Sequence, residues 1–70
     1  MYAEAEPLYQ RALAIREKAL GSQHPDVAAI LEKYSRLLRK TNREDEAIKL
    51  EQRAQAIRAK HTQENPTTNE

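Results

Sequence analysis

Two histidines and a few hydroxyl side chains are the residues of this sequence that could catalyse a reaction or bind a metal ion. A metal site needs histidines and carboxylates at spacings that bring them to one point, and a nucleophile needs an adjacent base. His24 and His61 stand 37 residues apart, and neither has such a partner. The chain has no cysteine and a single glycine, which excludes thiolate sites and phosphate-cradling loops. We therefore predict no catalytic, metal or cofactor site and a protein that is not an enzyme.

Three cations, Lys33, Arg36 and Lys40, could do a different kind of chemistry, which is the binding of carboxylates. At 100° per residue they share one side of a predicted helix, opposite its apolar residues. Those apolar residues are Val27, Ile30, Leu31, Tyr34, Leu37 and Leu38. Ammonium and guanidinium groups form charge-assisted hydrogen bonds with carboxylates, so this face is a candidate groove for acidic peptide segments. The alternative is a solvated helix face whose cations are favoured by the negative C-terminal end of the helix.

The charge balance and the hydropathy argue against nucleic-acid and membrane partners. The chain carries 12 basic and 11 acidic residues, which gives a net charge of +1, whereas nucleic-acid-binding domains are strongly basic. No apolar run approaches the ~18 residues that a membrane span needs, and no signal-peptide core is present. We predict a cytoplasmic protein that binds neither nucleic acid nor membranes.

Helix-forming residues dominate the chain, and its few helix breakers divide it into three parts. We predict an all-α protein with three antiparallel helices at about 3–20, 25–41 and 43–61. A polar tail at 62–70 is expected to be disordered. Pro7 is expected to mark the first turn of the first helix or to fray what precedes it.

The connections between these helices contain residues with specific backbone preferences. Gly21 suits the left-handed position that follows a helix, and Pro25 suits the first turn of the next one. Asn42 tolerates the left-handed conformation at the second connection. Thr41 and Glu44 have the spacing of a capping box, which predicts that the threonine begins the third helix.

The first and third helices are copies of one another. With an offset of 42 residues, positions 3–18 and 45–60 share ten identities in sixteen. The identical residues of the first copy are Glu4, Ala5, Leu8, Gln10, Arg11, Ala12, Ala14, Ile15, Arg16 and Lys18. Because polar positions match as well as apolar ones, a shared helical pattern does not account for them. The order is therefore B-A-B in a two-helix repeat.

Residues 2–18 and the connection Leu20-Gly21-x-x-His24-Pro25-Asp26-Val27-Ala28 carry a family resemblance. In these segments the chain resembles tetratricopeptide-repeat proteins, in the 42-residue variety of kinesin light chains. The resemblance covers residues 2 to about 60. It implies a right-handed superhelix of antiparallel helix pairs that acts as a scaffold for protein or peptide partners, and it implies that the histidine of the connection caps the second helix.

The resemblance also implies roles for individual residues. In this family the exposed side of helix A lines a concave groove, so Lys33, Arg36 and Lys40 match groove positions. Lys33 replaces an asparagine that commonly bonds the peptide backbone. Tyr2 and Tyr9 match aromatic residues of helix B that pack on neighbouring helices.

Among the differences between the two copies of helix B, three replace an aromatic or larger apolar residue by a polar one: Tyr2, Tyr9 and Leu13 of the first copy correspond to Glu44, Glu51 and Gln55 of the second. The last two fall on the side that would touch a following repeat, and a solenoid presents a polar face where it stops. We expect the third helix to cap the array and the chain to be the C-terminal end of a longer one. The alternative is sequence drift within an internal repeat.

The first helix lacks the A helix of its own repeat, so Leu8, Ala12 and Ile15 lack the neighbour that their pattern requires. We expect self-association, most simply a symmetric homodimer, formed side by side or by exchange of the first helix through residues 21–24. A protein-interaction scaffold is therefore the predicted function. A purely structural, self-associating helical element with no separate ligand is the alternative.

Overall fold

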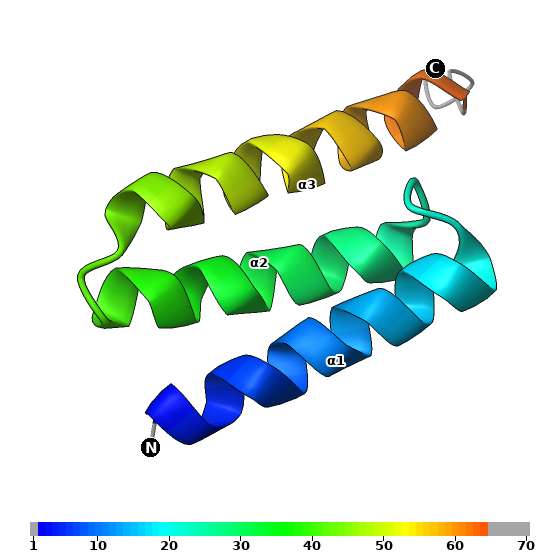
Figure 1. The fold of residues 1–70 in the computed structure, drawn as a ribbon. Coiled ribbons are helices and arrows are strands. Elements are labelled where there is room, and N and C mark those ends of the chain that lie inside the picture. The colour runs from blue at the N-terminus through cyan, green and yellow to red at the C-terminus, as the bar shows by residue number, and fades with distance from the viewer. Residues whose placement is uncertain (1, 65–70) are drawn as a thin grey trace.

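The computed structural model describes residues 2–64, and these form the three antiparallel helices that the sequence predicts. The helices are α1 (Tyr2–Leu20), α2 (Pro25–Lys40) and α3 (Glu44–Glu64). Figure 1 shows α2 between the other two, with tight connections at opposite ends. The all-α prediction is confirmed. The first three residues of the predicted tail belong to α3, and positions 65–70 lie outside the described residues.

Both connections use the predicted backbone conformations. Gly21 has a φ of 91° and its amide donates to the Glu17 carbonyl, which closes the last turn of α1. His24 is the N-cap of α2, where its Nδ1 accepts a hydrogen bond from the Asp26 amide at 3.0 Å. Asn42 is the one other described residue with positive φ, at 63°. These three residues therefore set the two reversals of the chain.

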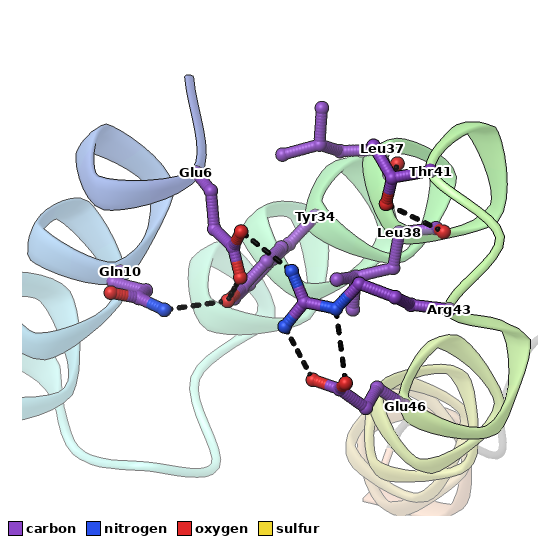
Figure 2. A network of polar contacts seen from close by, with 8 residues as sticks. All are labelled: Glu6, Gln10, Tyr34, Leu37, Leu38, Thr41, Arg43 and Glu46. Carbon is purple, nitrogen blue, oxygen red and sulfur yellow. Dashed lines mark hydrogen bonds and ion pairs between the residues drawn. The ribbon is translucent and has the colours of Figure 1, made fainter. Parts of the chain in front are cut away.

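Two predictions about helix ends are wrong. Thr41 does not begin α3; it ends α2, and its hydroxyl lies 3.3 Å from the Leu37 carbonyl and 3.0 Å from the Leu38 carbonyl (Figure 2). Carbonyls at a helix C-terminus lack internal partners, so a hydroxyl donor there competes with the capping-box role. Pro7 lies inside α1 rather than at its first turn, because the helix begins at Tyr2.

The core is built on α2, which is buried on two sides. Its buried residues are Val27, Ala28, Leu31, Tyr34, Ser35, Leu37 and Leu38. Against them α3 packs three fully buried residues, Ala47, Ala54 and Ile57. The helix α1 contributes only partly buried side chains, Ala5, Tyr9 and Leu13. The apolar contact that holds α1 is therefore smaller than the one that holds α3.

Candidate functional site

The predicted groove cations lie in one hollow between α1 and α2. The hollow has a volume of about 540 Å³ and is lined by Tyr2, Ala5, Tyr9, Lys33, Arg36, Leu37 and Lys40. A second hollow of about 450 Å³ shares Tyr9 and Lys33 with it and continues along the same two helices. Its other lining residues are Ala12, Arg16, Asp26, Ala29 and Ile30. Together they form a groove with a cationic half and a more apolar half.

The three cations differ in how they are held. All three are exposed. The Lys40 Nζ lies 5.9 Å from the centroid of the Tyr2 ring, which is within reach of a cation–π interaction. Within the described part of the chain, neither Lys33 nor Arg36 forms a hydrogen bond or an ion pair. Their charges are therefore available to a ligand in the groove.

Four other arginines are already engaged with carboxylates. Arg39 makes two hydrogen bonds to Glu51, at 2.7 and 2.6 Å, and Arg58 makes two to Glu32, at 2.6 and 3.0 Å. The remaining two, Arg43 and Arg53, bind carboxylates of α1 and α3. The cations of the groove thus stand apart from the arginines that tie the helices together.

Tyr9 forms the wall that the two hollows share, and it rests on Tyr34 of α2. The two rings are stacked, with centroids 6.0 Å apart and planes 11° apart. The Tyr34 hydroxyl donates to Glu6 at 2.9 Å and accepts from the Gln10 side chain at 2.8 Å. Burial raises the pKa of the Tyr34 hydroxyl, so it stays protonated and able to donate. The ring and its hydroxyl together fix α1 against α2.

The carboxylate of Glu6 extends this contact to α3, as Figure 2 shows. Arg43, in the connection between α2 and α3, donates to Glu6 at 2.6 Å and forms a bidentate pair with Glu46 at 3.0 and 2.7 Å. The hydrogen bond from Arg43, followed by that from Tyr34, lowers the pKa of the Glu6 carboxyl. This network links all three helices at one end of the molecule.

A second ion pair, between Glu17 and Arg53, joins α1 to α3 further along the helices. The two ion pairs therefore join α1 to the connection that precedes α3, through Glu6 and Arg43, and to α3 itself, through Glu17 and Arg53. The groove is lined by residues of α1 and α2 alone. None of the residues of these two ion pairs lines the groove, so the pairs do not close it to a ligand.

Both histidines make contacts that stabilise the fold. His24 caps α2, and the His61 Nε2 lies 2.9 Å from the Gln23 carbonyl oxygen. Over residues 2–64, histidines and carboxylates nowhere gather in groups of three that could hold a metal ion. None of the three described helices combines the length and the apolar content that crossing a membrane requires.

Comparison with known families matches residues 1–60 to the tetratricopeptide repeat. The chain belongs to the tetratricopeptide-repeat family. Comparison with curated proteins and with solved structures finds no match. Tetratricopeptide repeats are in general interaction modules without catalytic activity, and the family supports a scaffold role for this chain.

The residues predicted for self-association lie in two different places on this tetratricopeptide repeat. Leu8 and Ile15 are 63% and 59% exposed, while Ala12 is half-buried beside the groove. The packing of α1 on α2 uses Ala5, Tyr9 and Leu13 instead. The structure therefore divides the predicted set between an open face and the rim of the groove.

Sequence reasoning missed the contribution of α1 to the groove. Tyr2 and Tyr9 were expected only to pack on neighbouring helices, yet both line the hollow that holds the cations. Arg16 was not singled out, although it lines the second hollow. The order of the helices could have indicated this contribution. The helix that precedes helix A in the chain packs beside it, so its side chains line any hollow between the two.

Proposed function

We propose that this tetratricopeptide-repeat chain is a protein-interaction module that binds acidic peptide segments in the groove between α1 and α2. The observation that supports it is the gathering of Lys33, Arg36 and Lys40 at one hollow, with two of them lacking an ion pair within residues 2–64. Because neither cation would have to break an ion pair or a hydrogen bond within residues 2–64, a ligand carboxylate does not have to displace an internal partner.

The spacing of the cations suits an extended acidic peptide. Along a helix that rises about 1.5 Å per residue, Lys33 and Arg36 are offset by about 4.5 Å, and Arg36 and Lys40 by about 6 Å. In an extended chain alternate side chains point to the same side and are about 6.6 Å apart. Carboxylates two positions apart therefore match Arg36 and Lys40, and the guanidinium offers bidentate geometry to the first of them.

A titration with a fluorescent extended peptide that carries alternating glutamates tests this proposal. Binding should weaken as salt rises, and Arg36→Glu should weaken it at least tenfold. Lys60→Glu is the matched control, since it makes the same change of net charge at an exposed position of α3. Equal losses in the two variants, or no binding by the unmodified chain, would contradict the proposal.

We also propose that the chain binds neither nucleic acid nor membranes and acts in the cytoplasm. The net charge of +1 supports the first part, because nucleic-acid affinity depends on neutralising many phosphates. An oligonucleotide and an anionic lipid vesicle, titrated in place of the peptide at physiological salt, should give no saturable binding.

The proposed position of the chain is the C-terminal end of a repeat array of the kinesin-light-chain variety. Support comes from α3, where Glu44 and Gln55 are exposed and Glu51 turns back to Arg39 of α2. A polar outer face of this kind suits a terminal helix, because it offers little apolar surface to a following repeat.

Self-association is the second candidate function, in which α1 makes the chain a homodimer or another homo-oligomer without a separate ligand. The observation that favours it is the exposure of Leu8 and Ile15 two turns apart on one side of α1. Monomeric proteins rarely leave contiguous apolar surface uncovered. Sedimentation equilibrium at micromolar concentration should give a mass above the 8.1 kDa of one chain.

A further inference from the structure

The differences between the two copies of the repeat helix gather on one side of α1. Ten of the sixteen aligned pairs are identical, which leaves six that differ. Four of the six follow one another in α1 at steps of three or four residues, which places them on the same side of the helix. These four docking residues are Glu6, Tyr9, Leu13 and Glu17. All four are half-buried, whereas Ala3 and Pro7, at the two other differences, are exposed.

The two carboxylates among the docking residues meet arginines outside α1. Glu6 accepts hydrogen bonds from the Tyr34 hydroxyl at 2.9 Å and from Arg43 at 2.6 Å (Figure 2). Eleven residues later, Glu17 pairs with Arg53 of α3. Eleven residues span about 16.5 Å of helix, and a slip of one turn would move both carboxylates by about 5.4 Å. The two pairs therefore fix the position of α1 along its neighbours.

Tyr9 and Leu13 lie between the two carboxylates and supply the apolar part of the contact. The Tyr9 ring stacks on Tyr34, and Leu13 packs against the core cluster that contains Leu31 and Ile57. One side of α1 thus carries a carboxylate, an aromatic ring, an aliphatic side chain and a second carboxylate. Each of them has a partner in α2, in α3 or in the connection between them.

We infer that the α2–α3 pair selects its neighbouring helix by these four docking residues. The matching residues of α3 are Ile48, Glu51, Gln55 and Ala59. A neighbouring helix with that set would leave Arg53 unpaired and the buried Tyr34 hydroxyl without its acceptor, and it would place a polar amide beside the core. The helix α3 therefore could not take the place of α1 in front of a second α2–α3 pair.

This junction lies inside the described chain, so it does not depend on what precedes α1 or follows α3. A helix placed before α1 would cover Leu8 and Ile15, because these match Leu50 and Ile57, which pack on α2. It would leave the contacts of the docking residues in place. The inference also goes beyond the proposed groove, since it concerns the contact between repeats and not the binding of a separate ligand.

The first test gives α1 the residues of α3. One variant carries Glu6→Ile, Tyr9→Glu, Leu13→Gln and Glu17→Ala, and the matched control carries the two other differences, Ala3→Asp and Pro7→Lys. Amide hydrogen exchange should show that the four-residue variant loses protection in α1 by about tenfold or more, whereas the control keeps it. Equal protection of α1 in the two variants, or an unmodified chain with unprotected α1 amides, would overturn the inference.

The second test keeps the apolar contact and exchanges one pair of charges. Glu17→Arg and Arg53→Glu should each lower the protection of the α1 amides severalfold, because each brings like charges together. The combined variant restores opposite charges, so its protection should return to within about twofold of the unmodified chain. Unchanged protection in the middle of α2 and α3 shows that the fold survives. A combined variant no better protected than the single variants would overturn the pairing and the selection that depends on it.

Discussion

In α3, Ala54 and Ile57 are fully buried against α2, whereas in α1 the matching Ala12 is half-buried and Ile15 is largely exposed. The two helices share ten of sixteen residues, so composition does not explain the difference. The difference arises because α1 and α3 pack on different sides of α2 and use different faces of their own. The helix α3 packs through Ala54 and Ile57, whereas α1 packs through Tyr9 and Leu13. A repeat sequence therefore encodes two contact faces per helix, and the number of neighbours decides how many are used.

Positions at which α1 and α3 differ in sequence also make different contacts in the two helices. Tyr9 of α1 stacks on Tyr34, but its equivalent in α3, Glu51, binds Arg39. Glu6 of α1 binds Arg43, whereas its equivalent, Ile48, is partly exposed. The residues of α3 that are buried against α2 are thus shared with α1, whereas Tyr9 and Leu13, two of the residues that pack α1 on α2, differ in α3.

The largest effect should come from shortening the shared isoleucine in each helix. Ile57→Ala should destabilise the chain by about 2–5 kcal/mol, because it removes fully buried methylenes and leaves a cavity. Ile15→Ala should cost less than about 1 kcal/mol at concentrations where the chain is monomeric. Urea denaturation of both variants measures the contrast. Similar losses would mean that the two faces are equally covered in solution.

Restoring the first copy's residues in the second should make α3 resemble α1 at its outer face. The double variant Glu51→Tyr with Gln55→Leu replaces two polar side chains of α3 by aromatic and apolar ones, and it also removes the pair between Glu51 and Arg39. We expect end-to-end association beyond the dimer, because a following repeat's contact face is now exposed. Sedimentation velocity at rising concentration detects it. Unchanged sedimentation would argue that α3 is not a capping helix.

Acid should weaken the hydrogen bonds that Glu6 of α1 accepts from Tyr34 and Arg43. Arg43 and Tyr34 lower the pKa of this carboxyl in the folded chain, so its contribution to stability is present above the unfolded pKa and is lost as the pH falls through the folded value. Glu6→Gln should therefore be less stable than the unmodified chain at pH 7, and the two should converge on acidification. Denaturation curves at several pH values measure this. A constant gap between the two chains would show that the charge of Glu6 is not involved.

The smallest effect should follow substitution on the groove side of α2. Arg36→Glu should change the free energy of unfolding by less than about 1 kcal/mol, because Arg36 is exposed and has no ion pair within residues 2–64. Thermal unfolding followed by circular dichroism measures it. If the variant unfolded, the division of α2 into core and groove faces would be wrong.

Local signals in the sequence were sufficient for the helices and their turns. Gly21, His24 and Asn42 act within a few residues of their own positions, so their backbone roles could be predicted without tertiary information. Thr41 shows the limit of this approach. One hydroxyl could serve either the helix that ends or the helix that begins, and only the position of the last turn decided between them.

Contacts between helices were harder to predict. The pairs of Arg43 with Glu6 and of Arg58 with Glu32 join residues 37 and 26 positions apart, and many combinations of charged residues on amphipathic helices satisfy the same pattern. Likewise, the cations of α2 were predictable from helical periodicity. The tyrosine wall of α1 beside them depends on how the two helices cross, which periodicity does not specify.

The absence of any fully buried residue from α1 has a consequence for the order in which the described structure opens. We expect the most protected amide hydrogens, in the middle of α2 and α3, to exchange when the α2–α3 pair separates, and those of α1 to exchange more readily, when α1 lifts away from α2. Each such opening separates Tyr9 from α2 and so removes one side of the groove. A ligand that binds between α1 and α2 binds only while α1 is docked. It would therefore stabilise the docked state and slow the hydrogen exchange of α1 selectively.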